Sequence, residues 1–260
     1  MDHLSGLGLT LALGVGLVLG LLGGGGSILA LPIMLYAFRV PTKPAVAMSL
    51  AVVGMSAFVG FLSHWRQGTV VLRIAIPFGL CAMAGAFISA RLAHLVPATV
   101  QLYLFGLFAV TAAVLMLRDS MRPQLPDSGG SAGRMVPRFT PLLALQAVGV
   151  GVLTSLIGAG GGFVIVPALV LIARVPVKPA VGSSLLIITL NALAGFVGYI
   201  GQVPMNWPLI GAFTSVAALG AVLGAALVPF VPQRRIKQGF AVMIILLGGY
   251  IVLRGAGLAP

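Results

Sequence analysis

Apolar segments long enough to cross a membrane fill almost the whole chain, and this restricts its possible folds more than any other feature. They follow one another from Leu4 to Leu117 and again from Pro141 to Leu253. A helix needs about 20 apolar residues to cross the hydrocarbon core of a bilayer. Only 7% of the 260 residues are charged, whereas a typical soluble domain has about 25%. We therefore expect an all-α polytopic membrane protein without a soluble domain.

The second half of the chain repeats the first at a constant offset of 135 residues. The stretch RVPTKPAVAMSL at 39–50 returns as RVPVKPAVGSSL at 174–185, with nine of twelve residues identical. Two glycine clusters recur at the same offset: Gly23, Gly25 and Gly26 correspond to Gly158, Gly160 and Gly161. The correspondence needs no insertion over about a hundred residues. The sequence therefore predicts a duplicated membrane domain.

The repeat divides the chain into three parts. We expect a first transmembrane repeat over 1–118, a polar linker rich in Gly, Pro and Ser over 119–138, and a second repeat over 139–260. Each repeat begins with an apolar segment that glycines interrupt, at 4–38 and at 139–173. Three uninterrupted spans follow in each repeat, at 45–63, 72–93, 98–117, 180–200, 208–230 and 239–253.

The positions of Arg and Lys predict the orientation of these spans. Basic residues favour cytoplasmic loops, and the linker with its flanks carries Arg118, Arg122, Arg134 and Arg138. If each interrupted segment folds back as a hairpin, the RRIK cluster at 234–237 is cytoplasmic too, whereas a single crossing would place it outside. We therefore expect two repeats of inverted topology. Arg39 and Lys43 would then lie on the external side, an exception that we interpret as functional.

The glycine clusters predict a binding site. Irregular backbone survives in hydrocarbon only where protein buries it or where it lines a cavity. Two breaks in inverted repeats would meet near the midplane, and the free N–H groups of a helix start attract anions. Neither cluster is a phosphate-binding loop, since no Lys-Ser/Thr pair follows. Close packing of helices is the alternative, as for Gly16-xxx-Gly20 and Gly220-xxx-Gly224. The candidate binding residues of the two clusters are Gly23, Gly24, Gly25, Gly26, Ser27, Gly158, Gly160, Gly161 and Gly162.

The repeated V-P-x-K-P-A-V element adds a possible counter-charge. Its Pro44 and Pro179 suit the first turn of a helix, so Lys43 and Lys178 stand at helix starts, where the helix dipole disfavours a cation. An anion between the lysine and the helix terminus would relieve that conflict. The alternative is that both lysines extend toward lipid headgroups.

Small polar residues follow along the same helices. Ser49, Ser56 and Ser63 recur every seven residues and therefore share one helical face. Their counterparts in the second repeat are Ser184, Asn191 and Gly198, and Ser183 precedes them. These side chains either line the route of an anion or form hydrogen bonds between helices. We take Ser49, Ser56, Ser183, Ser184 and Asn191 as candidate binding residues, with Asn191 the best of them.

Acidic residues are nearly absent, which excludes several classes of function. Asp2, Asp119 and Asp127 lie at the terminus or in the linker, and Cys81 is the one cysteine. We therefore expect no enzyme, no metal site, no cofactor and no intramembrane carboxylate that relays protons. The net charge of +12 lies between apolar runs and fits membrane topology rather than nucleic-acid binding. An inside-negative potential drives a unit anion outward by about 2.3 kcal/mol per 100 mV, so anion export needs no coupling acid.

Three motifs resemble the sulfite exporter TauE/SafE family, also called the toluenesulfonate uptake permease family. They are the paired glycine breaks, the repeated V-P-x-K-P-A-V-x-x-S, and H-W-R-Q-G-T-V at 64–70 with Y-I-G-Q-V at 199–203. The resemblance implies a multi-pass permease of the bacterial inner (plasma) membrane for sulfite, organosulfonates or related sulfur-containing anions. Ala47-Met48 stand where the second repeat has Gly182-Ser183, which puts equal roles of the two repeats in question.

The sequence thus predicts an exporter of small sulfur-containing anions with a midplane site between inverted repeats. A passive anion channel, an uptake permease for a related anion, and a membrane scaffold whose glycines only pack remain alternatives. The expected partners are the anion and the lipid bilayer, without nucleic acid. A homo-oligomer such as a dimer is compatible with the sequence.

Overall fold

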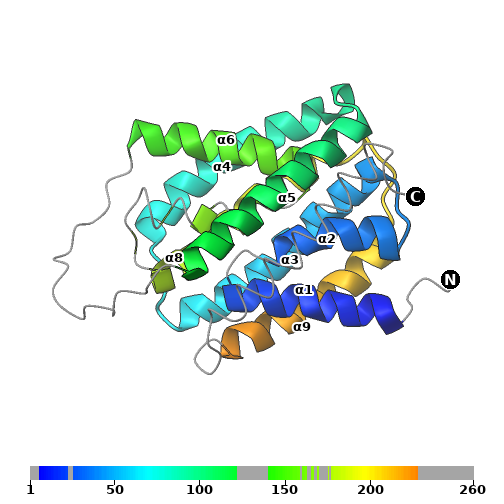
Figure 1. Ribbon diagram of the computed structural model, residues 1–260. Coiled ribbons are helices and arrows are strands. Elements are labelled where there is room, and N and C mark those ends of the chain that lie inside the picture. The colour runs from blue at the N-terminus through cyan, green and yellow to red at the C-terminus, as the bar shows by residue number, and fades with distance from the viewer. Residues whose placement is uncertain are drawn as a thin grey trace, which may run out of the picture.

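The computed structural model describes residues 6–22, 26–121, 140–158, 160–162, 165–166, 169, 175 and 177–227. Every regular element in these ranges is helical (Figure 1). The first half contains α1 (Gly6–Leu22), α2 (Ser27–Pro32), the π-helix η1 (Ile33–Ala37), α3 (Thr42–Arg66), α4 (Leu72–Leu92), the short η2 (Ala93–Leu95) and α5 (Ala98–Met121). The second half contains α6 (Pro141–Ile157), α8 (Val177–Tyr199) and α9 (Trp207–Leu227).

Four of these helical segments are long and apolar enough to cross a membrane: Thr42–Arg66, Leu72–Leu95, Pro179–Tyr199 and Trp207–Leu227. They contain the spans predicted at 45–63 and 72–93, the span at 180–200 except its last residue, and the described part of the span at 208–230. The predicted span at 98–117 lies in α5, which continues through the first linker positions to Met121. The span at 239–253 lies outside the described residues. Leu107, Leu145 and Leu219 are strongly exposed, as expected of side chains that face lipid. The chain is an integral membrane protein.

The offset of 135 residues also relates the first and last residues of equivalent helices in the two halves. Adding 135 to the bounds of α1 gives those of α6, and adding it to the bounds of α4 gives those of α9. The starts of α3 and α8 correspond in the same way. The duplication inferred from residue identities therefore extends to the local structure of both halves.

Each half packs its first helix on the other half. α1 lies along α9, and α6 lies along α4 (Figure 1). These contacts are equivalent in detail: Gly16 abuts the Ala217 carbonyl, and its counterpart Gly151 abuts the Ala82 carbonyl. The pairs Gly220 with the Leu13 carbonyl and Gly85 with the Val148 carbonyl are equivalent as well. Glycine lets two helix backbones approach closely, which is the packing role considered above for these positions.

α3 and α8 form the centre of the bundle. About three quarters of their membrane-crossing windows are buried, 78% and 72%, against 44% for α4 and α9. Gly60 of α3 lies against Leu185 of α8, and Leu50 lies against Gly195. The residue numbers of the contacts decrease along α3 while they increase along α8, so the two helices run antiparallel. The equivalent residues Ser56 and Asn191 stand near the middle of this crossing.

The first interrupted segment doubles back on itself. A Cβ at Gly26 would lie 2.5 Å from the Leu19 nitrogen, so α2 begins directly beside the last turns of α1. At the other end of the segment, a Cβ at Gly8 would lie 2.5 Å from the Phe38 ring. The predicted hairpin is thus present in the first half. In the second half Gly161 packs in the equivalent way on Thr154, the counterpart of Leu19.

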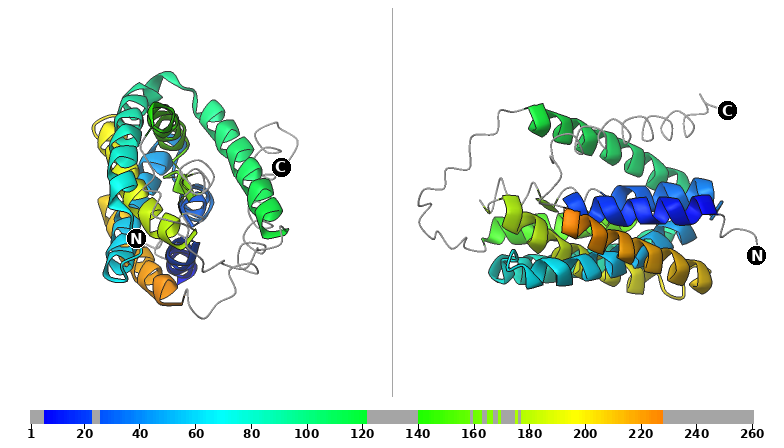
Figure 2. Two further views of the ribbon diagram at one scale, coloured as in Figure 1. Left: turned by 90° about the vertical axis from the view of Figure 1, so that its left-hand side faces the viewer. Right: turned by 90° about the horizontal axis from the view of Figure 1, so that it is seen from below.

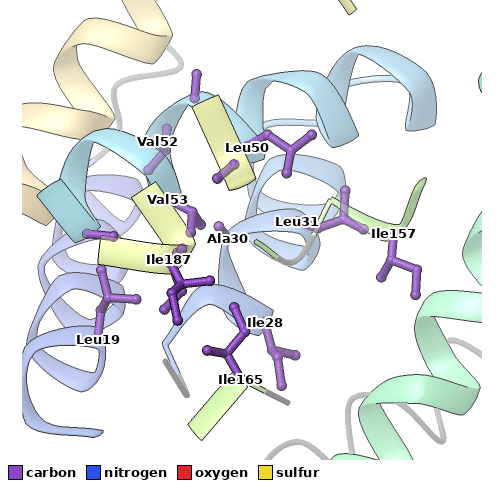
Figure 3. Close-up of a cluster of buried hydrophobic side chains, with 14 of the residues drawn as sticks. Leu19, Ile28, Ala30, Leu31, Leu50, Val52, Val53, Ile157, Ile165 and Ile187 are labelled. Atoms are coloured by element: carbon purple, nitrogen blue, oxygen red, sulfur yellow. The ribbon is translucent and has the colours of Figure 1, made fainter. Parts of the chain in front are cut away.

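The two interrupted segments meet in the apolar core of the molecule. Figure 3 shows side chains of the first segment near Ile157 and Ile165 of the second, together with side chains of α3 and Ile187 of α8. The cluster includes Leu19, Ile28, Leu50, Val53, Ile157, Ile165 and Ile187, all buried. α5 runs along one side of the bundle (Figure 2), and the Gln101 amide near its start donates to the Tyr199 hydroxyl over 3.4 Å. The interrupted segments are therefore central and not peripheral.

Replacing Gly16 by alanine tests the contact between α1 and α9. The added methyl would enter the Ala217 carbonyl, so we expect a loss of about 1–3 kcal/mol, the usual cost of overpacking. Gly14→Ala is the matched control, because a Cβ at Gly14 meets nothing within 4 Å. Thermal unfolding of the purified protein in detergent should show a lower Tm for the first variant alone. Equal Tm values for the two variants would contradict this contact.

Candidate functional site

The second glycine cluster forms a turn that only glycine accommodates without strain. Gly158 ends α6 with φ +76°, and Gly160 and Gly161 have φ +61° and +80°. These left-handed conformations disfavour any residue with a Cβ. Gly26 of the first cluster is different, since its φ is −60° and a side chain there would meet the Val15 carbonyl. Gly23, Gly24 and Gly25 lie outside the described residues.

Ser49 joins this turn to α3. Its hydroxyl lies 2.8 Å from the carbonyl oxygen of Gly158 and 2.8 Å from that of Val46, and the side chain is fully buried. Ser184, its counterpart on α8, is buried too and donates to the Val181 carbonyl over 2.7 Å. The structure therefore brings Ser49, named from its seven-residue spacing, to the glycine break.

Asn191 makes the second connection to the turn. Its amide nitrogen Nδ2 donates to Thr154 Oγ1 at 2.7 Å and to the Gly160 carbonyl at 3.3 Å. Its oxygen Oδ1 is buried and has no hydrogen-bond partner in the described part of the chain. Thr154 was not singled out from the sequence. Its counterpart Leu19 is apolar, so no regularity of the repeat indicates its role.

Ser56 occupies the position equivalent to Asn191 on α3. Its hydroxyl is buried, and it also has no hydrogen-bond partner among the described residues. Asn191 bonds to the hydroxyl of Thr154, but the counterpart of Thr154 in the first half is Leu19. Ser56 therefore finds no hydroxyl at the position equivalent to Thr154. Leaving a buried polar atom unpaired costs about 1–3 kcal/mol, and such atoms call for an explanation. Two of them at equivalent positions of the central crossing mark a polar site within the apolar core.

This polar centre is closed to solvent in the present conformation. Ser27, Ser49, Ser184 and Asn191 have no exposed surface, and Ser56 is 1% exposed. The described residues contain no cluster of His, Cys, Asp or Glu that could hold a metal ion. The centre thus offers the Ser56 hydroxyl as an unpaired donor and the Asn191 Oδ1 as an unpaired acceptor, both without formal charge.

An open cavity of about 550 Å³ lies at the end of the bundle where α3 begins. It is lined by Phe38, Arg39, Val40, Pro41, Pro44, Met48, Pro204, Met205, Asn206, Trp207 and Pro208. Met48 is 1% exposed and directly precedes Ser49, which bonds to the glycine turn. The lining of the cavity thus includes Met48 of α3 and not Ser49.

At the other end of the bundle, where α8 begins, the residues equivalent to the cavity lining are in close contact. A Cβ at Gly182 would lie 2.6 Å from the Thr69 carbonyl oxygen, and the Ser183 hydroxyl accepts the Val71 N–H over 2.8 Å. The counterparts of these residues, Ala47 and Met48 with Pro204 and Asn206, stand at the cavity end. The difference between Ala47-Met48 and Gly182-Ser183, visible in the sequence, thus coincides with a difference between the two ends.

Lys43 lies away from the second glycine turn. Lys43 Nζ donates to the His94 carbonyl over 3.2 Å, close to the start of α3. Six residues separate it from Ser49, which corresponds to roughly 9 Å along a helix. The side chain of Lys178 lies outside the described residues. In this conformation Lys43 ties α3 to η2 and does not reach the turn.

Membrane-crossing helices that bury a polar centre, with a cavity at one end of the bundle, fit the architecture of a polytopic membrane transporter. The model of the family described as sulfite exporter TauE/SafE matches residues 8–251, and the chain belongs to this family.

Several curated relatives resemble the chain over nearly its whole length. A probable membrane transporter protein of Xylella fastidiosa (strain Temecula1) is 32% identical over 244 residues, which cover 92% of each chain. The probable membrane transporter proteins YdhB and YunE of Bacillus subtilis are 25% and 27% identical and cover 86% and 94% of this chain, and 90% and 96% of their own. No solved structure matches the chain.

Replacing Gly160 by alanine tests the second turn. The left-handed backbone costs an alanine about 1 kcal/mol, and the new methyl would lie 2.5 Å from Val53 Cγ1. Gly201→Ala is the control, since Gly201 has φ +82° but no atom within 4 Å of a built Cβ. We expect the first variant to lose about 1–3 kcal/mol more than the control because of overpacking, as measured by thermal unfolding in detergent. Equal losses would show that Gly160 is not packed against α3.

Proposed function

We propose that the protein is an inner-membrane permease that exports small sulfur-containing anions, such as sulfite and organosulfonates, through a central site between its two halves. The observation that carries this proposal is the buried pair Ser56 and Asn191: the unpaired Ser56 hydroxyl can donate to an anion, and the unpaired Asn191 Oδ1 can accept from a protonated one. They stand at equivalent positions where α3 and α8 cross, and Asn191 bonds directly to the glycine turn. The description of the family as sulfite exporters supports the class of substrate.

The two halves have inverted topology in this proposal. Their equivalent helices α3 and α8 run antiparallel, and the contacts of α1 with α9 repeat between α6 and α4. A twofold axis through the α3–α8 crossing would generate this reciprocity. Transporters built from inverted repeats place substrate near the midplane at the repeat interface, the level of Ser56 and Asn191.

An anion suits the site because the membrane part of the chain carries no acidic side chain. The three acidic residues are Asp2, Asp119 and Asp127, and none belongs to the helices that form the centre. An anion would accept a hydrogen bond from the Ser56 hydroxyl, whereas the Ser49 hydroxyl could donate to it only by leaving the Gly158 carbonyl. The glycine clusters at 23–27 and 158–162 would add backbone N–H donors, with Ser183 and Ser184 nearby on α8.

The asymmetry of the two ends supports a permease over a channel. The cavity lies at one end, while Gly182 and Ser183 pack against Thr69 and Val71 at the other. Alternating access requires one open and one closed end, which the inverted repeats would exchange. The membrane potential favours outward movement of an anion, so export needs no coupling proton. A channel would instead show non-saturating currents in electrical recordings.

Replacing Ser56 by alanine should separate transport from stability. Removing an unpaired buried hydroxyl relieves its desolvation cost, so the Tm should stay the same or rise. If the hydroxyl bonds a bound anion, sulfite flux into or out of proteoliposomes should fall by about tenfold. Ser215→Ala is the control, because Ser215 is exposed and its hydroxyl bonds to the Gly211 carbonyl. Unchanged flux in the Ser56 variant would exclude this hydroxyl from the site.

The lysines of the repeated element are tested by the double variant Lys43→Ala and Lys178→Ala. In the proposed cycle they supply counter-charge at the two helix starts, so their loss should weaken sulfite and sulfoacetate flux several-fold. The same flux assay in proteoliposomes measures this effect. A double variant with normal flux would limit Lys43 to its structural bond with the His94 carbonyl.

A further inference from the structure

The cavity near Met48 has a lining of unusual composition. Its walls are mainly apolar, with Phe38, Met48, Met205 and Trp207 among them, and they include one cation, Arg39. No carboxylate belongs to the described lining. The volume of about 550 Å³ falls within the usual range of roughly 300–1,000 Å³ for sites that bind organic ligands. A bare oxyanion the size of sulfite would fill only a small part of it.

Arg39 holds a backbone conformation that is unusual for its type. Its φ is +52°, and no other non-glycine residue in the described part of the chain has a positive φ. The Val40 N–H bonds across it to the Met34 carbonyl at 3.0 Å, a helix-ending pattern in which glycine is the usual central residue. Arginine at this position costs about 1 kcal/mol. Backbone strain of this kind clusters at functional sites.

The charge of Arg39 is not neutralised. Its side chain is exposed at the cavity and forms no ion pair or hydrogen bond with another described residue. Asn206 stands in the same lining, where its Oδ1 accepts the Leu209 N–H over 3.1 Å and caps α9. This bond fixes the Asn206 side chain and does not use its NH₂ group. The cavity therefore offers a cation and a neutral donor, a combination that favours an anionic group.

The apolar part of the lining is held in place by its neighbours. Phe38 packs edge-to-face on Phe213, with ring centroids 5.8 Å apart. Trp207 packs in the same way on Phe196, with centroids 6.0 Å apart. These rings form fixed walls on which a carbon chain or ring can pack. Met48 adds an adaptable thioether at the inner end.

We propose that this cavity is a second binding site, separate from the central one, for an organic anion that carries an apolar group. Arg39 and the Asn206 amide hold the anionic end, and the Met48, Met205 and Trp207 side chains hold the carbon part. The site selects organic anions over bare oxyanions at one mouth of the transport route. The role in selecting transported anions rests on the proposed function, whereas the binding of an organic anion to the cavity does not.

Tryptophan fluorescence tests the binding directly. The chain has two tryptophans, so the Trp65→Phe protein reports on Trp207 alone. Butanesulfonate, butanoate and sulfite are titrated at equal ionic strength into this full-length protein in detergent. We expect a saturable change with both butyl anions and binding of sulfite at least tenfold weaker. Sulfite binding as tight as that of butanesulfonate, or no saturable response to either butyl anion, would overturn the proposal.

Substitution of Arg39 tests whether this residue binds the anionic group of the ligand. Arg39→Gln should weaken butanesulfonate binding by about tenfold or more, and Arg39→Lys should recover part of the loss. Arg73→Gln is the matched control, because Arg73 is an exposed arginine at the start of α4, outside the cavity lining. Unfolding temperature verifies that each variant is folded. Equal affinities of the Arg39→Gln and Arg73→Gln proteins would overturn the assignment.

Flux in proteoliposomes separates this inference from the proposed function. Arg39→Gln should raise the half-saturating concentration for butanesulfonate several-fold and leave sulfite flux nearly unchanged. Sulfite flux that falls equally in this variant would contradict a site for organic anions. If the unmodified protein moves neither anion, the proposed function fails even where Trp207 reports binding. If flux occurs without any Trp207 response, the second site alone fails.

Discussion

Backbone hydrogen bonding in hydrocarbon is the constraint on which the rest of this structure depends. Water is absent there, so each N–H and C=O group needs a partner within the protein. The second glycine turn meets this requirement with side chains from the central helices: Ser49 donates to the Gly158 carbonyl and Asn191 to the Gly160 carbonyl. The polar residues of α3 and α8 therefore have a structural role beside any role in binding. This role leaves two atoms unused, the Ser56 hydroxyl and the Asn191 Oδ1. The proposed site rests on the hydroxyl as a donor to an anion and on Oδ1 as an acceptor from a protonated one.

The duplication shapes the whole assembly through exchange of helices. Because α1 packs on α9 and α6 on α4, the interface between the halves is also the core of each half. The glycines at these contacts allow backbones to touch, and equivalent glycines appear at both contacts. Because these glycine contacts are tight, we expect α1 to move together with α9 and α6 together with α4, and the conformational change to occur at other contacts. The two ends of the bundle already differ in structure. One end has the cavity, and at the other end the counterparts of its lining residues are in contact.

The sequence predicted much of this architecture because duplication leaves a readable trace. Residue identity at a fixed offset predicted the helix correspondence. The distribution of Arg and Lys favoured a hairpin in the second interrupted segment and so in both, and the contact of Gly8 with Phe38 confirms the hairpin of the first. Ser49 and Asn191 were named from their spacing and do meet the second turn. Their role in binding stays a prediction, as do the roles of the lysines and glycines.

Other features were beyond the reach of the sequence for physical reasons. The cavity arises where residues 38–48 meet residues 204–208, and no local pattern predicts that distant pairing. Arg39 was interpreted as functional only because its charge stands on the expected external side; nothing in its neighbourhood signals a left-handed backbone at a non-glycine residue. Thr154 was missed because its counterpart is a leucine.

The pairing of α1 with α9 has a consequence for biosynthesis. Gly16 contacts Ala217, and at about 5–20 residues per second a ribosome needs roughly 10–40 seconds to make the intervening chain. During that interval the glycine-lined groove of the first helix has no permanent neighbour in the membrane. Insertion machinery, lipid or a temporary helix partner must cover it until the carboxyl-terminal part arrives, so assembly of this protein is completed only after most of the polypeptide has been synthesised.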